Sequence, residues 1–247
     1  MGSRVLFMAN SNCLVAFDKT RLMRAPQKCN YLVGKRSNRG MAWNTDRTKA
    51  LLLTAATEEF SDKGLAGARV DRIAAAAGVN KERIYQYFGK KDDLFDAVLA
   101  AELVRVMTDV PIEGHGAAAV GEYAGRLFDR HTKDGSLARL LFWEGLERGR
   151  NTVDRATRAD HCAVKVGQML AVLPGIDRTD AADLVLTIVT LCDGWTVLPQ
   201  IDALLAGSAP DRLDRRRAFI VRTATLVAED LLEGARREDA LLENSQS

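Results

Sequence analysis

A short run of the sequence, residues 81–88, concentrates side chains that could hydrogen-bond to nucleic acid. It contains two cations, one amide and two phenols: Lys81, Arg83, Gln86, Tyr85 and Tyr87. In the major groove of DNA, arginine and lysine pair best with O6 and N7 of guanine, and glutamine pairs best with N6 and N7 of adenine. This combination of residue types in one short segment therefore predicts contacts to base edges and phosphates.

Two short helical patterns, separated by one glycine, would position these side chains. In the first pattern Val70, Ile73, Ala74 and Ala77 recur at spacings of three and four residues, so they share one face of a helix. Gly78 follows directly, where the end of a helix favours a residue that tolerates a positive φ. The first helix is therefore expected to end at this glycine.

Asn80 is expected to begin the second helix. Its side chain can accept a hydrogen bond from a free N–H group of the first turn, as is typical of an N-cap. Ile84 and Phe88 would give this helix an apolar inner face and leave the basic and phenolic groups outside. Two helices joined by a tight, glycine-containing turn form a helix-turn-helix, whose second helix enters the major groove.

The flanking sequence extends this pattern in both directions. Residues 46–64 indicate an amphipathic helix that stops at Gly64, and GKKDDLF begins a longer fourth helix. The segments LLLTAATEEFSDKG and VDRIAAAAGVNKERIYQYFGKKDDLF resemble the N-terminal domain of the TetR/AcrR (tetracycline repressor-like) family of bacterial transcription regulators. The resemblance implies an all-α fold of about nine helices, with a three-helix DNA-binding domain followed by a C-terminal helical bundle.

One position departs from the pattern of this family. Members usually carry Thr or Ser just before the second helix, where it caps the helix and touches phosphate, whereas here Ala68 and then Arg69 occupy this place. We expect the Arg69 guanidinium to take over the phosphate contact. Lys91, at the start of the fourth helix, is expected to bind a second phosphate. The predicted DNA-binding residues are Arg69, Asn80, Lys81, Arg83, Tyr85, Gln86, Tyr87 and Lys91.

The charges divide the chain unevenly. Residues 1–40 hold eight of the 35 Lys and Arg but one of the 33 Asp and Glu, so acids outnumber bases in the remainder by 32 to 27. A DNA-binding protein with an acidic body must concentrate its positive charge locally, because phosphate contacts supply most of the non-specific affinity. The predicted motif does so, through Arg47, Lys49, Arg69, Arg72, Lys81, Arg83, Lys90 and Lys91.

Residues 1–43 are expected to form a basic, disordered extension. Three interpretations of it remain open: Met41 is the true start, the segment is an arm that reaches phosphates or the minor groove, or it is a small ordered element. The DNA-binding domain is predicted over 44–92. A ligand-binding and dimerisation domain is predicted over 93–240.

The predicted C-terminal domain is helical throughout. Helices are expected over 116–132, 136–149, 152–173, 179–205 and 210–235. The long helix over 179–205 is apolar on most faces, which is typical of a helix buried on several sides. We expect the last two helices to pair with those of a second copy in a four-helix bundle, because two half-sites are needed for useful specificity. The alternative is that both helices complete the core of one chain.

The resemblance implies a small-molecule effector held by the middle helices. Such sites are mostly apolar with a few placed polar groups. The predicted ligand-binding residues are the large or polarisable ones, although each could instead belong to the core: Phe128, His131, Phe142, Trp143, His161, Met169, Cys192 and Trp195. Glu144 follows Trp143, and Asp193 lies two residues before Trp195. Each of these pairs sets an acid beside an indole and could hold a cation.

The sequence argues against catalysis and against a metal site. Acid–base chemistry needs a convergent cluster of titratable groups, but the three histidines are scattered, and no HExxH motif or phosphate-binding glycine loop occurs. The four cysteines match no CxxC spacing and indicate free thiols, so no metal or cofactor is expected. The sequence therefore predicts a cytoplasmic, homodimeric repressor that leaves a palindromic operator when an effector binds. The alternative is a helical protein-interaction module without sequence-specific DNA binding.

Overall fold

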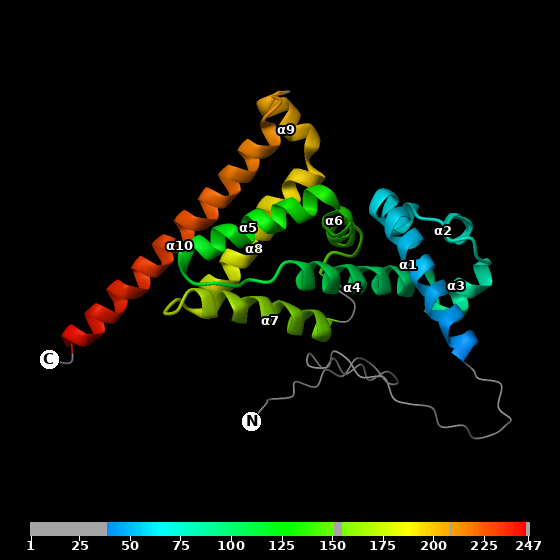
Figure 1. Cartoon of the computed structure of the whole chain (residues 1–247), viewed down its shortest axis with the longest axis horizontal. Coiled ribbons are helices and arrows are strands. Elements are labelled where there is room, and N and C mark those ends of the chain that lie inside the picture. The colour runs from blue at the N-terminus through cyan, green and yellow to red at the C-terminus, as the bar shows by residue number, and fades with distance from the viewer. Residues whose placement is uncertain (1–38, 151–154, 208, 246–247) are drawn as a thin grey trace, which may run out of the picture. The chain divides into compact units, whose positions relative to one another are not determined.

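The computed structural model describes residues 39–150, 155–207 and 209–245 (Figure 1). Residues 1–38 of the expected basic extension therefore lie outside the described residues. Within the described part of the chain the secondary structure is ten α-helices and no strand, which confirms the predicted all-α fold. The helices are α1 (Arg39–Gly67), α2 (Val70–Ala76), α3 (Lys81–Phe88), α4 (Lys91–Asp109), α5 (Gly116–Lys133), α6 (Ser136–Arg148), α7 (Arg155–Val172), α8 (Arg178–Val197), α9 (Pro199–Ala206) and α10 (Arg212–Ser245).

Helices α1, α2 and α3 share one apolar core. Leu52 and Phe60 of α1, Ile73 of α2 and Ile84 of α3 are completely buried, as the helical spacing requires. The ring of Phe60 packs edge-on against Phe95 of α4, with centroids 5.1 Å apart, so this core continues into the fourth helix. The predicted helix-turn-helix is thus present and rests on a shared core.

The ends of α2 and α3 differ from the sequence prediction in one detail. Gly78 has a positive φ of 66°, as expected of a residue that ends a helix. Asn80 occupies the N-cap position of α3, but its side chain makes no capping hydrogen bond, so the predicted side-chain cap is wrong. At α2 the backbone N–H of Arg69 donates to Oε1 of Glu59 at 2.9 Å. The Glu59 carboxylate of α1 therefore accepts a hydrogen bond at the N-terminus of α2, where the side chain of Ala68 has no oxygen that could cap the helix.

The C-terminal helices pack around α5. Helix α5 lies against α10 and α8, and α7 and α6 also contact α8 (Figure 1). Phe128 of α5, Met169 of α7, Ile188 of α8 and Ile220 of α10 are completely buried. Hydrophobic burial in this second part of the core therefore holds four helices together.

The predicted helix over 179–205 is instead two helices. Helix α8 ends at Val197, α9 begins at Pro199, and the two are bent by 84° at this break. Proline fits the first turn of a helix, where its missing N–H costs little, but it interrupts a helix interior. Among the described residues no single helix is long and apolar enough to cross a membrane, although this bent pair passes the same test of length and composition.

The other helix bounds shift modestly. Helix α1 begins at Arg39 instead of 46, and α10 continues to Ser245 instead of ending at 235. Gly64, the predicted stop of the first helix, has a non-helical φ of 70°, and one further turn follows it to Gly67. Six of the residues predicted to bind DNA lie on α3 or at the start of α4, and the other two, Arg69 and Asn80, occupy the N-cap positions of α2 and α3.

Candidate nucleic-acid interface

The outer face of α3 is open to solvent. Ile84 faces the core, whereas Arg83, Tyr85 and Gln86 are exposed, with 49% of the Tyr85 surface accessible. The hydrophobic period of α3 explains this orientation, because Ile84 and Phe88 are four residues apart and lie on the same side. The structure therefore leaves these three predicted DNA-binding side chains free to meet a ligand outside the protein.

Arg83 is held in place by two neighbours on the same helix. One guanidinium nitrogen, Nη1, donates to Oε1 of Gln86 at 3.3 Å and lies 3.2 Å from the Tyr87 hydroxyl, to which it also donates. The guanidinium also lies 5.9 Å from the centroid of the Tyr87 ring. Residues three and four positions apart on a helix are neighbours, which permits this arrangement. Gln86 was predicted to read adenine, but here its amide oxygen is engaged with Arg83.

Lys49 of α1 joins this cluster, although it was not among the predicted site residues. Its ammonium lies 5.7 Å from the centroid of Tyr87, within the range of a cation–π contact. Tyr87 is half-buried and thus brings together cations from α1 and α3. Sequence periodicity shows that Lys49 is on the exposed side of α1, but it cannot show that α1 crosses α3 at this point.

Lys81 and Arg69 flank the recognition face in different ways. The Lys81 ammonium lies 2.7 Å from Oδ1 of Asp71 on α2. The hydrogen bond to Asp71 raises the pKa of Lys81 above its usual range. Arg69 is exposed at the N-terminus of α2, and its backbone holds Glu59. Glu59 also accepts a hydrogen bond from Arg72, and this bond lowers the pKa of the carboxyl group.

Lys91 lies where α1, α2 and α4 meet. Its ammonium donates to the carbonyl oxygen of Ala66 at 3.3 Å and to that of Ala68 at 3.2 Å. An ammonium has three donors, so two of them serve these carbonyls. Lys91 was predicted to bind phosphate, and the structure adds a second role, because the same side chain closes the end of α1.

Helix α6 directly contacts α1, the first helix of the predicted DNA-binding domain. The indole Nε1 of Trp143 donates to the carbonyl of Ser61 at 3.2 Å, and Nε of Arg139 donates to the same oxygen at 2.8 Å. One turn further on, Oε2 of Glu147 accepts a hydrogen bond from the backbone N–H of Ala66. Trp143 was predicted to bind an effector, but its indole N–H is engaged with α1.

Four other predicted effector residues gather between α5 and α8. Phe128 packs edge-on against Trp195, with centroids 5.8 Å apart. Nδ1 of His131 lies 2.7 Å from Oδ1 of Asp193, and both side chains are buried. The thiol of Cys192 donates to a backbone carbonyl of α5, and burial raises its pKa to about 12. These contacts are those of a packed core, and Asp193 already faces an imidazole.

A pocket of about 200 Å³ lies between α4 and α7. His161 lines it, as one of the predicted effector residues. The other three predicted effector residues do not line this pocket. Met169 is completely buried, Phe142 is 37% exposed on α6, and Trp143 faces α1. The remaining walls come from Asp96, Ala97, Leu99, Ala100 and Leu103 of α4 and from Thr157 and Arg158 of α7.

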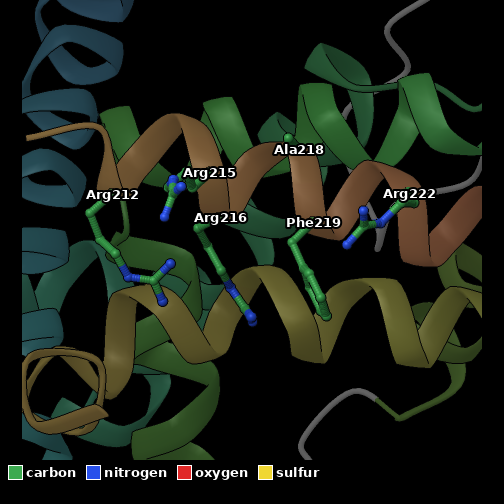
Figure 2. Close-up of a pocket in the computed structure, with 6 residues that line it drawn as sticks. All are labelled: Arg212, Arg215, Arg216, Ala218, Phe219 and Arg222. Atoms are coloured by element: carbon green, nitrogen blue, oxygen red, sulfur yellow. The ribbon is translucent and has the colours of Figure 1, made fainter. Parts of the chain in front are cut away.

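A wider groove of about 720 Å³ lies along the first turns of α10, as Figure 2 shows. Its lining includes Arg212, Arg216, Phe219 and Arg222. Arg212 bonds to Asp202 of α9 at 2.8 Å, and Arg216 donates to the carbonyl of Leu191 on α8. Half of the Phe219 surface is exposed. The groove therefore presents an aromatic ring among cations. Elsewhere, no group of three His, Cys, Asp or Glu side chains within the described residues could hold a metal ion.

Comparison with known proteins gives this geometry its context. Residues 52–98 match the family model of bacterial regulatory proteins of the tetR family, and residues 119–225 match that of tetracyclin repressor-like C-terminal domains. The chain belongs to the TetR family. The first match begins at Leu52 and ends at Val98, so it contains α2 and α3 entirely.

Relatives of this TetR-family chain are transcriptional regulators. The repressor SCO4008 of Streptomyces coelicolor is 36% identical over 194 residues, which cover 76% of this chain and 98% of that protein. The structure of SCO4942, a putative transcriptional regulator of the same organism, is 31% identical with a TM-score of 0.60, and the match covers 72% of this chain and 96% of that one. A Rhodococcus regulator at 21% identity supports the fold, with a TM-score of 0.58 and coverage of 77% and 97%.

Membership of this family confirms the predicted function class. The chain is a DNA-binding regulator of transcription, and α3 occupies the place of the recognition helix within the matched segment. Its relatives are named as transcriptional regulators, which is a non-enzymatic role. The individual DNA-binding and effector residues stay predictions, now with known positions.

Proposed function

We propose that this TetR-family protein is a transcriptional repressor that binds a palindromic operator as a homodimer and leaves it when a small effector binds. The observation that carries the proposal is the outer face of α3, where Arg83 stands preoriented and Tyr85 and Gln86 are exposed. The match covers nearly the whole length of a relative that is named as a repressor, which supports repression over activation. Arg83 would read a guanine, a contact worth about 1–3 kcal/mol of discrimination.

The surface of α8, α9 and α10 supports the homodimer. Large apolar side chains that a solvated surface would disfavour are exposed there: Leu186, Leu204, Leu205, Phe219 and Leu226. A two-fold axis places the same patch of both subunits in contact, so such a surface would be buried against its own copy. This is the interface expected from the last two predicted helices, because the predicted helix over 179–205 corresponds to α8 and α9.

The charges along α10 suit an antiparallel arrangement of its two copies. The first turns are basic, with Arg215 and Arg222 exposed, whereas Glu229 and Glu233 are exposed further along the same helix. An antiparallel pairing would bring the basic half of each helix towards the acidic half of the other. Opposite charges at an interface fix its register and favour the correct partner.

The pocket between α4 and α7 supports effector control. Helix α4 forms one wall of the pocket and also carries Lys91, which holds the end of α1. An effector that prefers one orientation of α4 would shift the population of DNA-binding states. A dimer reads a palindrome only if its recognition helices are about 34–36 Å apart, so a modest shift of α4 would release the operator.

The test is to select bound sequences from a random DNA pool and then to footprint the protein on the most enriched sequence. We expect an inverted repeat, protected by a dimer. The double variant Arg83→Ala, Gln86→Ala should lose the preference for this site, whereas Arg178→Ala, which removes an exposed arginine from the start of α8, should retain it. Selection without any consensus would support the rival interpretation, a helical protein-interaction module, and would overturn the proposal.

A further inference from the structure

The α4–α7 pocket has apolar walls with charged groups at its edge. Leu99, Ala100 and Leu103 supply the apolar surface, and Asp96 and Arg158 supply charges of opposite sign. Sites for small molecules commonly combine an apolar body with a few placed polar groups that fix orientation. The chemistry of the occupant therefore depends on which of the two charges is available.

Both charged groups are ion-paired with α6. Arg158 of α7 lies 2.6 Å from Oε1 of Glu144, and Asp96 of α4 pairs with Arg148. Arg148 also reaches Asp92, with 3.3 Å between its Nη2 and the carboxylate oxygen. Among the side chains that the structure describes, this network sets three carboxylates against two guanidiniums. It therefore holds an excess of one negative charge when all five groups are ionised.

An anion at Arg158 would either displace Glu144 or share the guanidinium with it, and sharing would add a negative charge to a network that already holds an excess of one. Glu144 is only 6% exposed, and within the described side chains no second cation contacts it. Removing Arg158 would leave a buried, unpaired carboxylate, which is strongly unfavourable. The pocket therefore disfavours an anionic occupant, although Arg158 and His161 both line it.

A bound cation could pair with Asp96 at a much lower cost in free energy. If Asp96 turns from Arg148 towards an occupant, Arg148 keeps Asp92, whose side chain is 65% exposed, and keeps its position 4.9 Å from the Phe95 ring. No charge is then left buried alone. In addition, burial raises the pKa of Asp96 despite the pair with Arg148, so its present partner compensates the lost solvation incompletely.

We propose that the pocket between α4 and α7 takes a small apolar cation, of the quaternary ammonium type, whose charge is met by Asp96 and whose body lies against Leu99 and Leu103. The assignment as effector site rests on the proposed function, whereas the binding itself does not. Arg148 lies on the helix whose Trp143 and Glu147 hold α1. A cation that draws Asp96 away from Arg148 therefore acts on the helix that contacts the DNA-binding domain.

The test uses the full chain and two probes that differ in charge alone. Benzyltrimethylammonium and neopentylbenzene have nearly the same shape, but only the first is charged, and their affinities can be compared by calorimetry or thermal shift. We expect the cation to bind at least about tenfold more tightly than its neutral counterpart. 3-Phenylpropanoate, as the anionic probe, should bind more weakly than either.

Two isosteric variants locate the charge that is responsible. Asp96→Asn should remove the preference for the cation, while retained binding of neopentylbenzene would show that the pocket is intact. Asp160→Asn removes an exposed carboxylate of α7 that does not line the pocket and does not belong to the network, and it should preserve the preference. Equal affinity for the two probes in the unmodified protein, or an unchanged preference in Asp96→Asn, would overturn the proposal.

Operator binding is measured separately, so that the two proposals can fail independently. A protein that binds the cation through Asp96 but selects no operator would refute the proposed function and leave the site standing. A protein that binds its operator but shows no Asp96-dependent preference for the cation would do the reverse.

Discussion

Glu147 of α6 accepts a hydrogen bond from the backbone N–H of Ala66 in α1 at 2.9 Å, across a sequence separation of 81 residues. Trp143 and Arg139 of the same helix donate to the carbonyl of Ser61, one to two turns earlier in α1. The DNA-binding helices are therefore connected to the C-terminal domain by α6 as well as by the continuous chain into α4. A displacement of α6 would therefore have to break these three hydrogen bonds or move the end of α1 with it.

Gly64 is the position in this contact that should tolerate substitution least. Its φ is 70°, and a Cβ added there would lie 2.8 Å from Cε3 of Trp143. Alanine must then adopt a strained backbone and push the indole aside, so we expect Gly64→Ala to lower the free energy of unfolding by about 1–3 kcal/mol. Urea denaturation measures this loss. Gly67→Ala is the matched control, because no positive φ is found there and its nearest neighbour would be 3.4 Å away.

Tyr87→Phe should impair DNA specificity without changing the charge of the interface. The substitution keeps the ring beside Lys49 and removes the hydroxyl that accepts a hydrogen bond from Arg83. A less constrained Arg83 should discriminate its base pair less well, by about 1 kcal/mol or less. The number of phosphate contacts is unchanged, so the slope of log affinity against log salt should stay the same.

Competition binding with operators that differ at single base pairs would measure this effect. The loss of discrimination should fall at the same base pair as that caused by Arg83→Ala, and it should be smaller. A uniform loss at all positions with an altered salt slope would instead assign Tyr87 to the DNA backbone.

The sequence was sufficient to predict the DNA-binding half because its signals are local. Ile73, Ile84 and Gly78 set the two helices and the turn through periodicity and a positive φ, and each behaves as these patterns require. The failed side-chain cap at Asn80 has a different origin. Capping depends on a rotamer and not on residue type alone, and the corresponding cap on α2 comes from Glu59, ten residues earlier than Arg69.

The effector half has weaker sequence signals because its contacts are long-range. An aromatic side chain such as Trp143 has the same sequence signature whether it lines a pocket or packs on another helix, and its hydrogen-bond partner, Ser61, lies 82 residues away. Pro199 illustrates a different kind of error. It stood inside an apolar run that favoured one long helix, although proline is compatible with a new helix that starts at that residue.

Lys165 should make stability depend on pH in the alkaline range. Its ammonium is buried on α7 and donates to the carbonyl of Val110, at the end of α4, at 2.6 Å. Burial, with a smaller contribution from Arg126, lowers the pKa of Lys165 to about 8 from its ordinary value of 10.5. Between these two values the unfolded chain binds more protons than the folded one, so stability attributable to this group rises as the pH increases from 8 to 10.5.

The variant Lys165→Met isolates this effect. The difference between the two pKa values corresponds to roughly 3 kcal/mol, so unfolding free energies at pH 7.5 and pH 10 should diverge between the two proteins by up to this amount. Other groups that titrate above pH 9, such as Cys192, are common to both and cancel. Parallel pH profiles would show that Lys165 has an ordinary pKa in the folded protein.

Phe219→Glu should separate the two copies of the proposed homodimer. Phe219 is half exposed on α10, between Arg215 and Arg222 and one heptad before Leu226, which is 56% exposed. In the proposed antiparallel interface a carboxylate at this position would face the acidic half of the partner's α10 and lose solvent on association, so both desolvation and repulsion oppose pairing. Light scattering coupled to size exclusion should show a shift from dimer to monomer, accompanied by much weaker binding to the full palindrome.

The control for this variant is Leu146→Glu, which introduces the same carboxylate at a leucine that is 77% exposed on α6, outside the proposed interface. It should remain dimeric and bind DNA normally. If Phe219→Glu also stays dimeric while Leu146→Glu dissociates, the two-fold axis would have to lie against α6, and α8 and α10 would then complete the core of a single chain.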